Sequence, residues 1–172
     1  MKKPAEPITD PKQAHAKALR MLERRPYPAA ELVRALRTRG VVANVASDVV
    51  EQLRETGLVN DETYARSFAR SRLVARGNSV RRVQMELSRK GVERNAASDA
   101  IAEVREDEGL ATEDASVERA ARKKLRLMAG LEPLVRARRL TAFLARRGYE
   151  IDAIRSVLRR LDKEAASRGE AN

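Results

Sequence analysis

The chain has no cysteine and no tryptophan, a single histidine, and only five aromatic residues in 172. Without cysteine it can form neither disulfide bonds nor thiolate metal sites. This fits a reducing compartment, so we expect a cytoplasmic protein. His15 is the only histidine, so the chain has almost no residues from which to build a histidine metal site or a catalytic triad. No apolar run approaches the ~20 residues that cross a bilayer, so we expect no membrane contact.

The sequence motifs of common catalytic sites are also missing. There is no GxxxxGK[ST] phosphate loop, no GxGxxG dinucleotide motif and no HExxH zinc motif. Ser79 and Ser88 have no histidine that could activate them as nucleophiles. The acidic run at residues 106–108 is typical of a solvated helix end. We therefore predict no enzymatic activity, no cofactor and no metal.

Basic residues are abundant, and the formal net charge is +11. A protein this basic usually meets a polyanion, and nucleic acid is the first candidate. The charge is uneven, because residues 66–94 hold nine basic and two acidic residues, whereas residues 95–118 hold one basic and eight acidic. Residues 119–163 are basic again, with fourteen basic and four acidic residues. The acidic block could meet a basic patch on a partner or balance charge within the protein, and we favour the second.

Glycines mark the ends of the helical segments. Seven of the eight follow apolar residues spaced three to four apart, where a left-handed residue can end a helix. We predict nine helices between these stops, near residues 14–25, 29–39, 43–56, 61–76, 79–90, 94–108, 112–129, 133–147 and 150–166.

These helices fall into three similar groups. The segments that begin at Glu31, Arg82 and Arg139 have a glycine and five apolar residues in the same register. A group of about 50 residues is near the lower limit for an independent core, so neighbouring groups should share contacts. We predict an all-α fold of three tandem three-helix repeats stacked into an elongated, curved body. The predicted parts are a flexible leader at 1–13, repeats at 14–58, 59–110 and 111–167, and a tail at 168–172.

Cations recur at the same place in each group, directly before the shared glycine. Lys90 and Arg147 occupy this position in the second and third groups, and Arg89 and Arg146 precede them. Cations in a last turn complement the helix dipole, which we take as their main role. They would also present a row of positive charges to a partner.

Another basic group lies within residues 60–82. Tyr64 and Phe68 follow the spacing of a buried helix face, so we expect them in the core rather than stacked on bases. The arginines of this group, on other faces and around residues 77–79, are the candidate contact surface. A helix that begins at Ser79 could bind a phosphate through its backbone N–H groups, or Ser79 could simply cap it.

Two segments carry a family resemblance. Residues 61–72, DETYARSFARSR, and residues 76–92, RGNSVRRVQMELSRKGV, resemble the signature of the RecX regulatory proteins. Residues 18–41 are similar to the first unit of that family, and the resemblance covers most of the chain from Ala14 onward. It implies three tandem three-helix repeats in a bacterial protein that binds the RecA recombinase in the groove of the RecA–DNA filament. Such a protein would inhibit ATP hydrolysis and recombination by RecA, and so restrain DNA repair and the SOS response.

On this interpretation the chain acts as a monomer on RecA and on DNA, single- or double-stranded, without strong sequence preference. The candidate contacts are Arg66, Arg70, Arg72, Arg76, Arg81, Arg82, Arg89, Lys90, Arg146 and Arg147. The alternatives are a helix-turn-helix or a nonspecific DNA-binding protein, although the basic faces lack the Asn or Gln pairs that read adenine. The sequence leaves open whether the protein caps filament ends, blocks the groove or does both.

Overall fold

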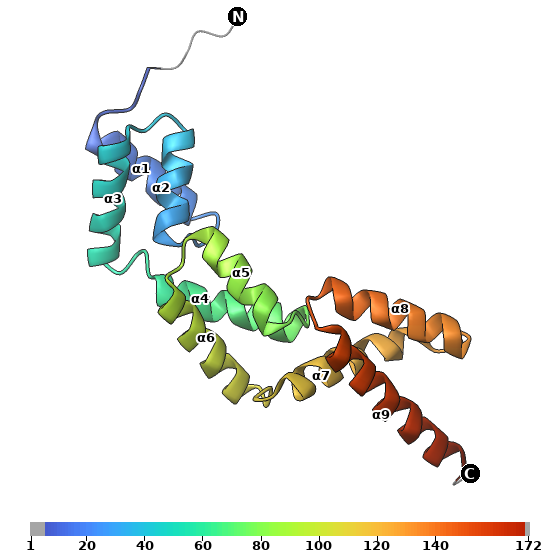
Figure 1. The fold of residues 1–172 in the computed structure, drawn as a ribbon. Helices are drawn as coiled ribbons and strands as arrows, with labels where there is room; N and C mark the ends of the chain where they lie inside the picture. Colours follow the sequence, from blue (N-terminus) through green and yellow to red (C-terminus); the bar gives the residue numbers. More distant parts are fainter. Residues whose placement is uncertain (1–5, 171–172) are drawn as a thin grey trace, which may run out of the picture. The chain divides into compact units, whose positions relative to one another are not determined.

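The computed structural model describes residues 6–170, and the described chain is helical almost throughout (Figure 1). Its nine α-helices confirm the all-α prediction. They are α1 (Pro11–Leu22), α2 (Ala29–Thr38), α3 (Ala43–Glu55), α4 (Asp61–Arg70), α5 (Val80–Lys90), α6 (Arg94–Asp107), α7 (Glu113–Leu125), α8 (Pro133–Arg146) and α9 (Ile151–Glu170). A π-helical segment, Ser71–Ala75, continues α4, and a 3-10 turn, Arg126–Met128, continues α7.

The two terminal helices differ from their predicted bounds: α1 covers Pro11–Leu22 instead of residues 14–25, and α9 covers Ile151–Glu170 instead of residues 150–166. Helix α1 begins at Pro11 rather than residue 14, because the Asp10 side chain caps it by accepting from the Lys12 backbone N–H at 2.9 Å. Ile8 is also held, since its backbone donates to the Gly40 carbonyl at 2.8 Å and accepts from Val42 at 3.1 Å. Residues 1–5 of the predicted leader lie outside the described residues. Helix α9 runs past residue 166 because no glycine or proline occurs before residue 169.

Internal contacts divide the chain into two compact units. Unit 1 contains the described residues up to 67 together with 86–98, and unit 2 contains 68–85 together with the described residues from 99 onward. The division therefore passes through α4, α5 and α6. In unit 1 the core is built mainly from α1, α2 and α3, around Leu32, Leu36 and Leu53. In unit 2 a core from α7, α8 and α9 includes Leu140, Leu144, Ile154 and Val157.

Unit 1 contains a close junction between two repeats at Gly91. A Cβ atom at Gly91 would lie 2.4 Å from the Ala30 Cβ of α2, so only glycine permits this approach. The last carbonyls of α5 find a hydrogen-bond donor in Arg34, which also belongs to α2. Its guanidinium donates to the carbonyls of Arg89 at 3.2 Å and Lys90 at 2.7 Å. The second helix of the first repeat thus caps the second helix of the next.

Unit 2 contains a similar junction at Gly148. A Cβ there would lie 2.7 Å from the Ser79 Oγ and 3.0 Å from the Arg82 Cβ. The end of α8 is capped by residues at the start of α5. The Ser79 backbone N–H donates to the Arg147 carbonyl at 2.9 Å, and the Ser79 hydroxyl donates to the Gly148 carbonyl at 2.8 Å. Arg82 donates in addition to the Arg146 carbonyl. In the first repeat, by contrast, a Cβ at Gly40 would have no neighbour within 4 Å.

The three equivalent glycines should therefore differ in their tolerance of alanine. All three have φ of 88–89°, which alone costs an alanine about 1–2 kcal/mol. Gly91→Ala and Gly148→Ala add overpacking at the junctions, which typically costs a further ~1–3 kcal/mol, whereas Gly40→Ala does not. Urea unfolding followed by circular dichroism measures the difference. Equal losses in all three variants would show that the junctions are not tightly packed.

Candidate functional site

The predicted contact residues are divided between the two units. Unit 1 holds Arg66, Arg89 and Lys90. Unit 2 holds the other seven, from the end of α4, the start of α5 and the end of α8: Arg70, Arg72, Arg76, Arg81, Arg82, Arg146 and Arg147. Unit 2 therefore brings most of the candidate cations into one body.

Arg70 is engaged by the acidic block. Its guanidinium donates to the carboxylates of Asp107 at 2.8 Å and Glu108 at 3.0 Å. Other carboxylates of the block pair within unit 2 as well, since Glu118 accepts from Arg122 at 2.8 Å and lies 3.1 Å from Arg160. The prediction that the acidic block balances charge within the protein is confirmed for these residues.

The aromatic residues of α4 lie at the edge of the core. Ala65 and Ala69 are fully buried, whereas Tyr64 and Phe68 are half-buried because their longer side chains reach the surface. A cation then covers each ring. The Lys90 Nζ lies 5.9 Å from the centre of the Tyr64 ring, and the Arg72 guanidinium carbon lies 4.6 Å from that of Phe68. Base stacking on these rings would have to displace the cations.

Ser79, directly before α5, belongs to a junction between helices and does not offer its backbone N–H to a phosphate. Ser79 is 2% exposed, its backbone N–H is bonded to the Arg147 carbonyl, and its hydroxyl accepts from the Arg82 N–H at 3.3 Å as a helix cap. Asn78 is 4% exposed and accepts from the Arg147 guanidinium at 3.0 Å. The phosphate-binding alternative is therefore wrong for Ser79, because its N–H faces protein. Arg81, although exposed, forms an ion pair with Glu150.

Two exposed candidate cations of unit 2 form no ion pair with a described carboxylate. Arg76 and Arg146 are exposed, and no carboxylate among the described residues pairs with either side chain. Arg66 and Arg89 of unit 1 are exposed as well. An anionic partner could bind Arg76 and Arg146 without breaking an internal ion pair, so they are the most available of the ten.

Lys90 is part of an ion-pair cluster in unit 1. Its ammonium lies 2.8 Å from the Glu31 carboxylate, which also accepts from Arg25 at 2.6 Å. Burial alone would raise the pKa of Glu31, but the hydrogen bonds from Lys90 and Arg25 outweigh it and lower that pKa below its usual value. Burial alone would lower the pKa of Lys90, but its interactions with Glu31 and Tyr64 outweigh burial and raise that pKa. Lys90 therefore ties α5 to α2.

Because the pKa of Glu31 is lowered on folding, its charge should stabilise unit 1 in a pH-dependent way. The stabilisation is present above the unfolded pKa, about 4.3, and disappears as pH falls through the folded pKa. Wild type should therefore exceed Glu31→Gln in unfolding free energy at pH 5–7 and lose that lead at lower pH. Urea unfolding at several pH values measures this.

The matched control is Glu23→Gln, which removes an exposed carboxylate with no ion-pair partner among the described residues. Its difference from wild type should be small at every pH. A pH-independent gap for Glu31→Gln would show that the Glu31 charge contributes nothing.

Several residues that organise these sites were not found from the sequence. Arg34, Asn78 and Glu31 bond to partners 55 or more residues away. Asn78 lies within residues 76–92, which carry the family resemblance, but nothing in the sequence indicated the distant partner of any of the three. Across the described residues no group of three or more His, Cys, Asp or Glu side chains could hold a metal ion. No helix there has the length and apolar content needed to span a bilayer.

The fold and these surfaces define a class of protein: a basic array of three-helix repeats in which part of the carboxylates and cations form contacts within the protein. Family comparison gives the particular assignment. Residues 14–53, 60–101 and 112–158 match the first, second and third three-helix domains of RecX, in that order. The chain belongs to the RecX family, and the prediction of three tandem three-helix repeats is confirmed.

Individual relatives agree with this assignment. The chain is 35% identical to the regulatory protein RecX of Streptomyces coelicolor over 161 residues, which cover 92% of this chain and 84% of that protein. It is 38% identical to that of Mycolicibacterium vanbaalenii over 143 residues, or 80% and 76% of the two chains. The crystal structure of RecX from Lactobacillus salivarius shares the fold, with a TM-score of 0.66, 21% identity, and coverage of 88% and 96%.

Proposed function

We propose that the protein binds the RecA–DNA filament in the cytoplasm and inhibits ATP hydrolysis and recombination by RecA, thereby restraining DNA repair and the SOS response. Family membership along nearly the whole chain is the observation that carries this proposal. On this proposal the protein acts as a monomer that binds within the RecA filament, and it catalyses no reaction itself.

The surface of unit 2 supports this function. DNA in such a filament presents phosphates, and RecA presents charged groups of both signs. Arg76 and Arg146 are exposed and unpaired with any described carboxylate, so binding an anion costs them no internal contact. A protein bound across neighbouring RecA subunits would hold one arrangement of them, and so shift the population away from the arrangements that hydrolysis requires.

The test is the DNA-dependent ATPase of RecA with this protein added below the concentration of RecA. Inhibition at moderate salt should persist, because contacts to RecA are included in the binding. A protein that only coats DNA would have to cover the lattice, and its binding would fall steeply with salt. Loss of inhibition under these conditions would favour the nonspecific DNA-binding alternative.

Charge reversal at the two available cations should weaken inhibition. Arg76→Glu combined with Arg146→Glu removes two attractive contacts and adds repulsion, so about tenfold more protein should be needed for half-inhibition of the ATPase. Circular dichroism should show unchanged helicity, because neither side chain has a described ion-pair partner.

The matched control is Lys12→Glu combined with Arg24→Glu, two exposed cations of unit 1 outside the candidate set. This variant has the same net charge as the first. Equal weakening by both variants would mean that total charge, and not this surface, sets the affinity.

A further inference from the structure

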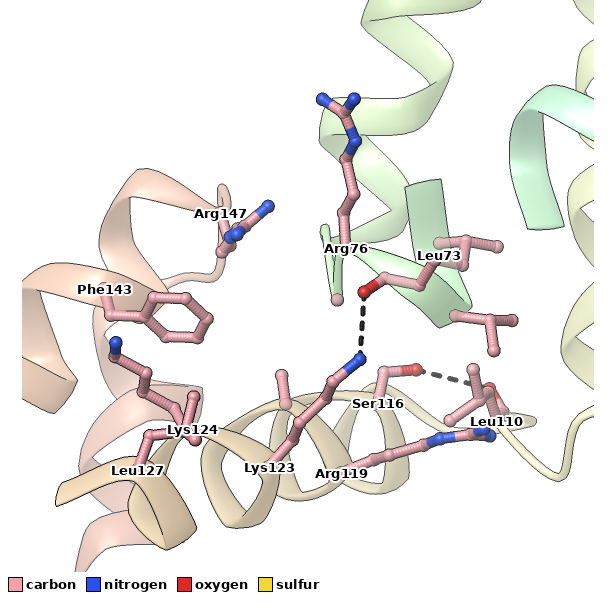
Figure 2. A pocket seen from close by; sticks show the side chains of 14 residues that line it. Leu73, Arg76, Leu110, Ser116, Arg119, Lys123, Lys124, Leu127, Phe143 and Arg147 are labelled. Atoms are coloured by element: carbon pink, nitrogen blue, oxygen red, sulfur yellow. Dashed lines mark hydrogen bonds between the residues drawn. The ribbon is translucent and has the colours of Figure 1, made fainter. Parts of the chain in front are cut away.

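A cavity of about 240 Å³ opens within unit 2, and two of the candidate contact residues, Arg76 and Arg147, line it (Figure 2). It is bounded by the end of the π-helical segment, by α7 and the turn that follows it, and by α8. Its apolar wall consists of Leu73, Val74, Leu110, Ala120, Leu127 and Phe143. Leu127 is 77% exposed, so this wall leaves a large apolar side chain in water.

The edge of the cavity is positively charged. Its lining includes five cations and no carboxylate. One of them, Arg119, pairs with Glu108 at 3.5 Å. The other four pair with no carboxylate among the described residues and are here called the cationic rim: Arg76, Lys123, Lys124 and Arg147.

Three members of the rim are held in place by contacts that leave their charge uncompensated. The Lys123 ammonium donates to the Ala75 carbonyl at 3.1 Å, across the cavity in Figure 2. The ammonium of Lys124 and the guanidinium carbon of Arg147 lie 5.5 Å and 5.0 Å from the centre of the Phe143 ring. Carbonyls and rings orient these cations but do not neutralise them, so the cavity combines an apolar interior with a preorganised positive edge.

We propose that this cavity binds an acidic segment of a protein partner that presents one aliphatic side chain. That side chain would enter the apolar interior against Leu127 and Leu73, and neighbouring carboxylates would pair with the cationic rim. The cavity is large enough to admit a side chain of leucine or methionine size. The inference rests on the proposed function in so far as the partner is RecA, but the binding site is defined by its own chemistry.

The geometry favours such a segment over a nucleobase. A base would need the face of Phe143 for stacking, and two cations already stand over that ring. It would also need hydrogen-bonding partners inside the cavity. The Ser116 hydroxyl there already donates to the Thr112 carbonyl at 3.1 Å, and most of the remaining wall is aliphatic.

The binding test uses the full chain and a fluorescein-labelled peptide with a single leucine between short runs of glutamate, followed by fluorescence anisotropy. Leu127→Glu should weaken binding about tenfold or more, because it removes apolar surface and adds a repelling charge. Since Leu127 is largely exposed, this variant should keep its helicity. The matched control is Leu134→Glu, at a leucine of unit 2 that is 86% exposed and does not line the cavity. It should bind the peptide within about twofold of wild type.

Two further probes decide what the cavity recognises. A peptide with serine in place of leucine should bind about tenfold more weakly, and equal binding would overturn the apolar anchor. Labelled oligothymidylate should bind Leu127→Glu and Leu134→Glu equally. If Leu127→Glu selectively loses the oligonucleotide and not the peptide, the cavity is a nucleic-acid site and the proposal is overturned.

The RecA ATPase assay separates this inference from the proposed function. Inhibition of RecA by wild type without any peptide binding would overturn the cavity assignment alone. Peptide binding that depends on Leu127, without any effect on RecA, would support the cavity and overturn the proposed function. If both hold, Leu127→Glu should require more protein than Leu134→Glu for half-inhibition.

Discussion

The last carbonyls of a helix have no partner within it, and the repeats of this molecule are joined by satisfying them. At Gly91 and Gly148 a helix end approaches another helix closely, and the orphan carbonyls accept from Arg34 in one case and from Ser79 and Arg82 in the other. The absence of a side chain at the glycine makes the approach possible, and the donors give these last carbonyls partners within the protein. Both conditions must hold together for small three-helix groups to share contacts.

This way of joining repeats uses many of the cations that give the chain its charge. Lys90 pairs with Glu31, Arg70 with the acidic block, and Arg82 with a helix end. Other exposed cations form no ion pair with a described carboxylate, among them Lys12 and Arg24 of unit 1 and Arg76, Arg138 and Arg146 of unit 2. Some cations therefore serve contacts within the protein, whereas others, such as Arg76 and Arg146, are exposed without a described carboxylate partner.

The features that could be predicted from the sequence are local or repeated. Apolar spacing and the positive-φ glycines located the nine helices of the described chain, and the shared register of Gly40, Gly91 and Gly148 indicated the repeats. The start of α1 was misplaced because Asp10 and Pro11, which begin the helix, were interpreted as part of a loose leader. Nothing local indicated that Ser79 would be buried under another repeat.

The candidate site was less predictable, because its geometry depends on residues far apart in the chain. The sequence identified which cations cluster, but not that Lys90 would meet Glu31, 59 residues away, or that Arg147 would meet Asn78. The cavity of unit 2 was missed for the same reason. Its only local signal was Leu127, an apolar residue in a strongly basic stretch.

The junctions at Gly91 and Gly148 both place a helix end close to another helix, but the residues that contact the glycine are not equivalent in the two repeats. When the repeats are aligned on their glycines, Ala30 corresponds to Arg81 and Arg34 corresponds to Met85. A methyl group meets the incoming helix at one junction and a serine hydroxyl at the other. The repeats are therefore not interchangeable parts. A chain in which the repeats were shuffled, or in which one was duplicated, would place surfaces that do not match against each other. The residues at the junctions therefore determine the order of the repeats.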